Sequence, residues 1–318
     1  MPRGAQDLLA HRAGVDVDVA LNRLADAAAS RLLDPDQVLT GAVGPGRVIP
    51  DDIVSVADLD LGLTEDQMIR LGREELASWL EMGSRFEAAL NAGLSILILQ
   101  TDDLTASQVR FLLHEIGEET RHQRAFIRVI EQLQPQARNP LRKAWLKPIE
   151  RLLLSQLVGL PALTHVFVMA GEEVPDVFQK HTAEHPDTDP FVAVVNRYHR
   201  QEEARHLSYV RTVFPQIWAN TSALDRALVR HVVPLLLRDI GRILVHPGVY
   251  ATVGLPAWKT WRAANHTPSR RRLLIEAYRP ILKMLIQAGV FENKIPATWQ
   301  KLCDVHADGT PRNQTAGE

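Results

Sequence analysis

The sequence predicts an all-α protein, a helix bundle with additional helices. Long segments carry apolar residues at helical spacing, and signals typical of a helix start precede two of them. No segment shows the sustained alternation of apolar and polar residues that is typical of strands. With 318 residues, the chain is long enough to bury a large core.

Three parts are expected along the chain. Residues 1–60 have weak periodicity and include the Gly/Pro-rich loop LTGAVGPGRVIPDD, so we expect an N-terminal arm lying on the main body. Residues 61–305 form the predicted main domain. Residues 306–318 are polar and form a predicted flexible tail.

Six segments of the main domain are predicted to be helical. Thr64 and Gln67 have the spacing of a capping box at the start of the first. Thr105 and Gln108 repeat this spacing ahead of the second. The predicted helices cover residues 63–99, 109–133, 149–174, 191–214, 222–244 and 269–291.

Prolines and turn residues separate these segments. NPLRKAWLKP breaks the chain before the third helix, and HPDTDP breaks it before the fourth. Pro161 and Pro175 are expected to kink the third helix, because proline lacks the N–H that an interior helical position donates.

Composition excludes several classes of function. The formal net charge of -2 provides no field that would attract nucleic acid or an anionic membrane. The single cysteine, Cys303, excludes an internal disulfide and any multi-cysteine metal site, and no base is placed to activate it. The first residues lack the apolar core of a signal peptide, and apolar runs such as LSILIL are too short for a membrane span. We therefore expect a cytoplasmic protein without nucleic-acid or membrane partners.

One motif occurs twice, as EETRH ending at His122 and as EEARH ending at His206, 84 residues later. In the second copy His199, Glu203 and His206 stand at positions i, i+4 and i+7, so they share one helix face. Valines precede and follow them on that face. A buried carboxylate and two imidazoles need a partner, and a metal ion is the natural one.

The first copy has the same character. Glu119 and His122 stand at i and i+3, on a face that also carries Leu112 and Phe126. This Glu-x-x-His spacing is found in four-helix bundles with carboxylate-bridged dimetal sites. Glu115 lies one turn earlier on the same helix face, and it is a candidate for a residue that contacts the metal ligands without binding metal itself.

A dimetal site of this kind needs one more glutamate on each of two other helices. Glu87, 32 residues before Glu119, lies on an apolar face and is preferred to Glu74, Glu75 and Glu81. Before the second copy, Glu172 and Glu173 are both candidates. Glu172 is preferred because it lies 31 residues before Glu203 and aligns with Asp176 and Gln179, whereas Glu173 has the more apolar neighbours.

Other polar residues have ordinary explanations. Glu118, Arg121, Glu202 and Arg205 are expected as solvated or ion-paired flanks of the motifs, or at most as outer hydrogen-bond donors. His114 and His231 lie in apolar-looking helices and are expected to be core histidines. A single Glu-x-x-His is weak evidence, but two copies, each interrupting an apolar face and each following an inward glutamate, predict a dimetal site. Oxygen and imidazole ligands without thiolate suit iron, with manganese as the competitor.

The doubled motif resembles that of ferritin-like diiron oxygenases and acyl-carrier desaturases. With His199 it becomes His-x-x-x-Glu-x-x-His, and the stretch HPDTDPFVAVVNRYHRQEEARH is similar to the p-aminobenzoate N-oxygenase (AurF-like) family. This resemblance, over roughly residues 65–240, implies a ferritin-like fold. It also implies a homodimer and seven metal ligands, namely Glu87, Glu119, His122, Glu172, His199, Glu203 and His206.

The resemblance implies a monooxygenase-type oxidoreductase with two iron ions. It would use dioxygen and an external electron donor to oxidise the amine nitrogen of a small, aromatic substrate to hydroxylamine or nitro, in a biosynthetic pathway. The alternatives are a diiron desaturase or C-hydroxylase, and a ferritin-like metal-handling protein. His199 favours the N-oxygenase because desaturases lack this third histidine. No catalytic residue beyond the metal ligands is expected, since the metals carry the chemistry.

Overall fold

Helices are the regular elements of the described part of the chain. The structure, a computed structural model, describes the backbone of residues 4–142 and 159–312, and side chains from residue 17 onward within these ranges. Within them there is no strand, and a single β-bridge joins Val305 and Pro311. The predicted all-α class is confirmed, as a ferritin-like bundle with additional helices.

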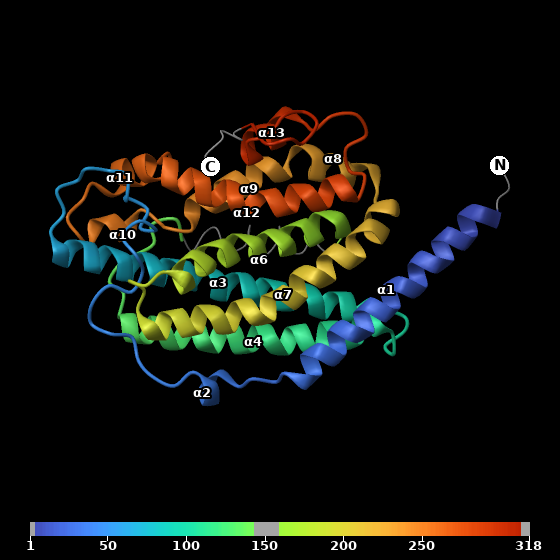
Figure 1. Cartoon of the computed structure of the whole chain (residues 1–318), viewed down its shortest axis with the longest axis horizontal. Coiled ribbons are helices and arrows are strands. Elements are labelled where there is room, and N and C mark those ends of the chain that lie inside the picture. Colours follow the sequence, from blue (N-terminus) through green and yellow to red (C-terminus); the bar gives the residue numbers. More distant parts are fainter. Residues whose placement is uncertain (1–3, 143–158, 313–318) are drawn as a thin grey trace.

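Four long helices form the bundle: α3 (Glu65–Leu99), α4 (Ser107–Leu133), α6 (Pro161–Glu184) and α7 (Pro190–Ala219). α3 packs against α4 and α6 against α7, and contacts between α3 and α6 and between α4 and α7 join the two pairs. The four helices run side by side along the length of the molecule (Figure 1). Short connections make each pair antiparallel.

The structure confirms one of the two predicted helix caps and contradicts the other. Thr64 and Gln67 form the predicted capping box of α3. The predicted second cap is wrong, because the hydroxyl of Thr105 donates to Asp103 and Gln108 donates to the hydroxyl of Tyr209. α4 starts after Ala106 without a side-chain cap.

The third predicted helix is described only from residue 159 onward, and its predicted beginning lies outside the described residues. Pro161 is not a kink: it is the first residue of α6, where proline leaves no hydrogen bond unmade. Pro175 lies inside α6, and the kink expected there stays a prediction.

Two helices precede the bundle, α1 (Gly4–Ser30) and α2 (Pro35–Val38). The weak periodicity of this region did not predict α1, which packs against α4 and α7 and buries Leu21 and Ala25. The Gly/Pro-rich loop that follows buries Val48 and Ile49 in the apolar cluster around α3. The division of the chain at residue 60 stays a prediction.

Six shorter helices follow the bundle within residues 220–312: α8 (Ala223–His231), α9 (Val233–Ile243), α10 (Gly248–Ala251), α11 (Ala257–Ala264), α12 (Pro268–Gln287) and α13 (Ala297–Cys303). The helix predicted over residues 222–244 is divided into α8 and α9 beside Pro234, which cannot donate a backbone hydrogen bond. α12 packs against α6, and α13 packs against α9 and α12 (Figure 1). None of the described helices combines the length and the apolar character that a membrane span needs.

Two apolar clusters enclose the middle of the bundle. α3, α4 and α7 each contribute to both clusters, at different heights along the helix. The contributing residues include Leu80 and Leu90 on α3, Phe126 and Leu112 on α4, and Val195 and Val210 on α7. The predicted metal ligands of these helices lie between the two clusters, so the fold surrounds a polar layer with apolar side chains.

Candidate metal centre

All seven predicted ligands lie in this polar layer, and none exposes more than 3% of its surface. They come from all four bundle helices: Glu87 from α3, Glu119 and His122 from α4, Glu172 from α6, and His199, Glu203 and His206 from α7. Burying four carboxylates together is very costly unless cations or protons offset their charges.

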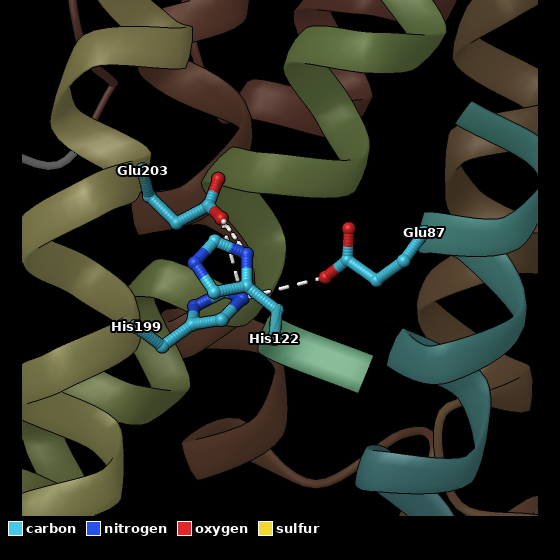
Figure 2. A group of neighbouring side chains, drawn as sticks. All are labelled: Glu87, His122, His199 and Glu203. Carbon is cyan, nitrogen blue, oxygen red and sulfur yellow. Dashed lines mark hydrogen bonds and ion pairs between the residues drawn. The ribbon is translucent and has the colours of Figure 1, made fainter. Parts of the chain in front are cut away.

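One group of four side chains offers atoms within 4.8 Å of one another: Glu87, His122, His199 and Glu203. Nε2 of His199 lies 3.4 Å from Oε1 of Glu87 and 3.3 Å from Oε1 of Glu203. Nδ1 of His122 lies 3.2 Å from the same oxygen of Glu203. Figure 2 shows the two imidazoles between the carboxylates of α3 and α7, so two nitrogen and two oxygen donors converge.

A second group meets the same distance condition: Glu119, Glu172, Glu203 and His206. Nδ1 of His206 lies 2.9 Å from Oε1 of Glu119 and 3.5 Å from Oε2 of Glu203. The other oxygen of Glu119 lies 3.0 Å from Nδ1 of His122. Glu119 and Glu203 therefore each direct one oxygen toward His122 and the other toward His206, the arrangement of two carboxylates that bridge adjacent cations.

Several ligand atoms of these groups form no hydrogen bond of suitable geometry among the described residues, although some of them lie within ion-pair distance of one another. They are Oε2 of Glu87, Oε1 of Glu119, Oε1 of Glu172, both oxygens of Glu203 and Nδ1 of His206. Buried polar atoms almost always form hydrogen bonds, so a cluster of carboxylate oxygens and an imidazole nitrogen without them is unusual. Metal ions would satisfy these atoms together, and the donor set of carboxylates and imidazoles suits iron or manganese.

Proton affinities in the cluster differ strongly between neighbours. Burial opposes protonation of His122, but its contacts with Glu119, Glu202 and Glu203 raise its pKa well above the usual range. Burial opposes protonation of His206 too, and the charges of Glu119 and Glu203 raise its pKa in the same way. Protons on these imidazoles offset the carboxylates in the absence of metal, so metal uptake must release protons.

Two other residues of the cluster prefer the neutral form. Burial, followed by the charge of Glu119, raises the pKa of Glu87 well above its usual value. Burial, followed by the charge of His122, lowers the pKa of His199 well below its usual value. A neutral imidazole keeps a nitrogen lone pair available, which is the state that binds a metal ion.

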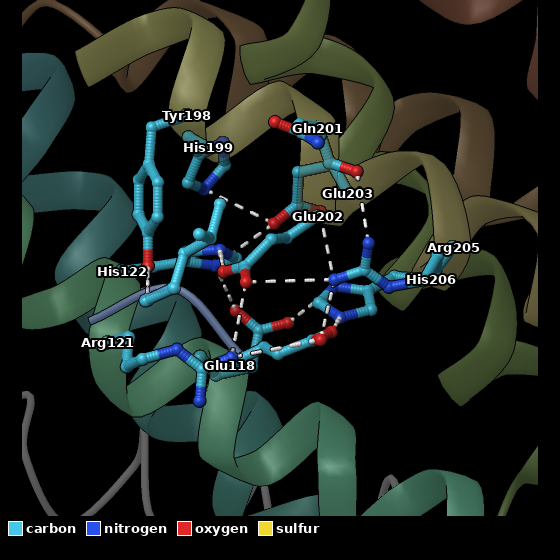
Figure 3. A network of polar contacts seen from close by, with 12 residues as sticks. Glu118, Arg121, His122, Tyr198, His199, Gln201, Glu202, Glu203, Arg205 and His206 are labelled. Atoms are coloured by element: carbon cyan, nitrogen blue, oxygen red, sulfur yellow. Dashed lines mark hydrogen bonds and ion pairs between the residues drawn. The ribbon is translucent and has the colours of Figure 1, made fainter. Parts of the chain in front are cut away.

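The two copies of the motif support each other reciprocally (Figure 3). Nε2 of His122, in the first copy, lies 2.9 Å from Oε2 of Glu202 in the second. Nε2 of His206, in the second copy, lies 2.8 Å from Oε2 of Glu118 in the first. A proton held between Nε2 and a carboxylate leaves Nδ1 free to face the cluster, and the carboxylate fixes the ring and raises its basicity.

The arginines of the motif complete this exchange. Arg121 donates to Glu202 at 3.2 Å, and Arg205 donates to Glu118 at 2.6 Å. Each arginine thus pairs with the glutamate of the other copy. These pairs neutralise the outer carboxylates, so the outer groups add little net charge to the centre.

Comparison with known proteins identifies the family. A model of the p-aminobenzoate N-oxygenase family AurF matches residues 16–289. The chain belongs to the AurF family. It is also similar to uncharacterised proteins of Mycobacterium bovis and Mycobacterium tuberculosis, with 23% identity over 252 residues, 78% of this chain and 72% of theirs. The AurF family is a diiron family, and in this member buried carboxylate and histidine groups are able to hold metal ions.

The outer residues of this AurF-family site differ from the sequence-based expectation in one respect. Glu118 and Glu202 are ion-paired, as one of the expected alternatives had it, but each is only 1% exposed, so the solvated alternative is wrong. Their role as acceptors for the histidines was missed. The signal was present in the sequence, because the glutamate and the arginine recur in both copies together with Glu-x-x-His.

His199 has an outer partner of a different kind. Its Nδ1 lies 2.8 Å from Oε1 of Gln179, and since an amide oxygen only accepts, Nδ1 carries the proton and Nε2 faces Glu87 and Glu203. Gln179 and Asp176, which align with Glu172 along α6, both form hydrogen bonds with α7, Gln179 with His199 and Asp176 with Arg200.

The remaining candidate glutamates serve other contacts. Glu173, the alternative to Glu172, forms an ion pair with Arg211 of α7 and is absent from both groups. Glu74 accepts from the backbone N–H groups of Gln136 and Ala137, and Glu75 accepts from Ser55. These two were expected on polar faces but are buried, because they cap loops that pack on α3.

Glu115 is buried beside the AurF-family centre without a partner. Neither of its oxygens has a hydrogen bond within the described residues, and none of its atoms joins either ligand group. Burial raises the pKa of Glu115 to about 8, although the charge of His206 opposes this. Its carboxyl is therefore mostly neutral at pH 7.

Aromatic rings border the cluster. The ring centroids of Phe126 and His199 lie 4.8 Å apart, and those of Phe111 and His206 lie 6.5 Å apart. α3 and α6 approach closely here, because a Cβ on Gly171, the neighbour of Glu172, would overlap the ring of Phe86. These contacts keep the centre apolar around its ligands.

Three further expectations concern residues outside the centre. Cys303 is fully buried, and burial raises the pKa of its thiol to about 12, so it is unreactive. His231 is exposed and His114 is half-buried, so the expectation of core histidines is wrong for both.

Proposed function

We propose that this protein is a diiron oxygenase that uses dioxygen to oxidise the amine nitrogen of a small, aromatic substrate in a biosynthetic pathway. The observation that carries the proposal is the pair of donor groups connected by Glu203 and Glu119. It provides two neighbouring cation positions with shared carboxylates and an additional imidazole on one side. Iron is the proposed metal, with manganese as a competitor.

The proposed ligands divide into two sets. Glu87, His122 and His199 would hold one ion, and Glu172 and His206 would hold the other. Glu119 and Glu203 would be shared, because each directs one oxygen toward His122 and the other toward His206. Four carboxylates would offset the charge of two divalent cations. Each set has one carboxylate of its own, so the two sets differ in the additional imidazole of His199 and not in charge.

The chain's own residues prepare this site. Glu118 and Glu202 hold protons on Nε2 of the histidines and so direct the Nδ1 lone pairs inward. Gln179 holds a proton on Nδ1 of His199 and so directs the Nε2 lone pair inward. Phe111 and Phe126 help to exclude water, which protects an oxidising centre from side reactions.

Bound iron, when reduced, supplies the binding and activation of dioxygen. The first oxidation consumes the amine, dioxygen, two electrons and two protons, and yields the hydroxylamine and water. The electrons come from an external donor. We also propose that the protein is a homodimer, as the family resemblance implies, and that it is cytoplasmic, as its composition suggests.

Metal analysis tests the proposal. The purified protein should bind two iron equivalents per chain, and reduction followed by oxygen exposure should change its optical spectrum. His122→Ala and His206→Ala should each lower iron content and abolish the spectral change, while His165→Ala, a buried histidine bonded to a backbone carbonyl, should not. Full iron and full oxygen reactivity in both ligand variants would show that the metal site lies elsewhere.

His199 distinguishes N-oxygenation from the other diiron reactions. His199→Ala leaves four glutamates and two histidines, so it should remain folded and hold iron. It should react differently with oxygen and lose turnover of p-aminobenzoate, because losing a ligand opens a coordination position to water. Wild-type oxygen kinetics and wild-type amine turnover in an iron-loaded His199→Ala protein would refute the N-oxygenase assignment and leave the dimetal centre standing.

A further inference from the structure

A strongly basic groove runs along the outer face of α12, outside the metal centre. It encloses a volume of about 1060 Å³. Five cationic side chains line it, Arg211 of α7 and Arg271, Arg272, Arg279 and Lys283 of α12, against the two carboxylates Glu276 and Asp304. Five positive minus two negative charges give a formal surplus of +3, on a chain whose formal net charge is -2.

Three of the five cations of this α12 groove remain available to a partner, because Arg211 already pairs with Glu173 and Arg271 with Asp304. Arg272 and Lys283 are exposed, and no carboxylate of the described residues lies within ion-pair distance of either. Arg279 donates to a backbone carbonyl, which leaves its charge uncompensated. Glu276 is already engaged by Lys180 and His181, so it does little to weaken the positive field of the groove.

The lining of the α12 groove favours a macromolecule over a small ligand. An adjoining cavity of about 360 Å³ shares Arg272 and Glu276 with the groove but adds the carboxylate of Asp52, so the basic surface does not extend into it. Small-molecule pockets are mostly apolar with a few polar groups, whereas these walls are dominated by charged side chains. Exposed charges of one sign steer a complementary protein toward docking.

The groove is also connected to the metal centre. Arg211, on its wall, forms an ion pair with Glu173 of α6. Glu173 adjoins Glu172, whose carboxylate belongs to the second donor group. α12 itself packs against α6. A protein seated on α12 would therefore lie against the helix that supplies Glu172.

We propose that the α12 groove docks an acidic electron-transfer protein that supplies electrons to the centre. This rests on the proposed function, because an oxygenase of this kind consumes two electrons in each oxidation. Each docking delivers one electron: the reduced iron–sulfur cluster of the donor is oxidised by one electron, and one ferric ion of the centre is reduced to ferrous. Weak, salt-dependent association over a small interface is typical of such partners.

Binding of a small acidic [2Fe–2S] ferredoxin to the full-length protein tests the docking. We expect salt-sensitive binding that is strong at about 0.02 M salt and lost at about 0.5 M salt. The double variant Arg272→Glu, Lys283→Glu should bind at least about tenfold more weakly. The matched control is Lys259→Glu, Arg262→Glu on α11, with the same change of charge on another exposed surface, and it should bind like the wild type.

Equal weakening in both double variants, or no salt-sensitive binding by the wild type, would overturn the proposal. Flavin mononucleotide binding that requires Arg272 and Lys283, without ferredoxin binding, would instead assign the groove to a small anion and also overturn it. Binding does not depend on metal content, so its failure is distinct from failure of the diiron assignment.

Reduction of the iron-loaded protein provides the second readout. Ferredoxin should reduce the groove variant about tenfold more slowly than the wild type, while the methyl viologen radical, a cation, should reduce both equally. If ferredoxin binds at the groove but reduces both proteins at one rate, electron delivery through this surface is refuted.

Discussion

The reciprocal contact between the two motif copies predicts that Glu202→Gln weakens one metal position and Glu118→Gln the other. Glu202 accepts from Nε2 of His122 at 2.9 Å, with both side chains excluded from solvent. A hydrogen bond to a charged acceptor is worth about 1.5–3 kcal/mol, and a neutral one about 0.5–1.5 kcal/mol. Glutamine keeps an acceptor oxygen but removes the charge. The hydrogen bond to His122 should therefore contribute about 1–2 kcal/mol less free energy.

This loss corresponds to roughly 5- to 30-fold weaker binding of the ion that His122 would hold, which overlaps the lower part of the range of about 10- to 100-fold typical of such outer groups. The assay is an anaerobic titration of metal-free protein with ferrous iron, followed to two equivalents per chain. Glu202→Gln should weaken one of the two binding steps, and Glu118→Gln, through His206, should weaken the other. Glu131→Gln, an exposed residue of α4, is the control and should titrate like the wild type.

Wild-type affinity at both steps in both variants would refute the reasoning, because the outer glutamates would then be only charge partners of the arginines. Equal weakening of both steps by either variant would also count against it, since it would indicate general loss of structure. Thermal unfolding of the metal-free variants separates that case.

Three other outcomes follow from the structure. Glu172→Ala should lose more iron than Glu173→Ala, because Glu173 binds a half-exposed arginine, and the reverse order in metal analysis would overturn the choice of ligand. Burial raises the pKa of Glu75 to about 7, so the native state keeps a proton that the unfolded state loses above its ordinary pKa of 4.5. The wild type must therefore lose stability as pH rises between these values. Relative to it, Glu75→Gln should gain about 3 kcal/mol in the free energy of unfolding between pH 4.5 and pH 8, and a difference that is constant with pH in denaturant titrations would contradict this. Gly171→Ala should lower the free energy of unfolding by about 1–3 kcal/mol, because its methyl group would overlap the ring of Phe86, and an unchanged unfolding midpoint would argue against the close approach of α3 and α6.

The sequence predicted the bundle because helical periodicity is strong where one face is buried and the other is not. It did not predict α1, where about half of the apolar residues are alanines and the contrast between the helix faces is small. It misplaced the cap of α4 because Thr105 satisfies its hydroxyl locally with Asp103 before the helix begins. Short-range capping signals compete with turns of the same composition, and only the tertiary structure decides between them.

The seven clustered residues were predictable for a similar reason. A polar residue on an otherwise apolar helix face is visible in sequence, and helix geometry places neighbours at i+3 and i+4 beside it. The outer partners were less visible because they connect different helices. Gln179 lies on the same face of α6 as Glu172, but which imidazole it reaches depends on the packing of α6 against α7.

The duplicated glutamate and arginine now have a physical reason. Each copy of Glu-Glu-x-Arg-His contributes its second glutamate and its histidine to the cluster, and its first glutamate and its arginine to the opposite copy. With a single copy, one histidine would lack an acceptor for Nε2, and one buried glutamate would lack its cation, at a cost of several kcal/mol. The two halves of the motif are therefore coupled, and a substitution in one copy should change the metal position of the other.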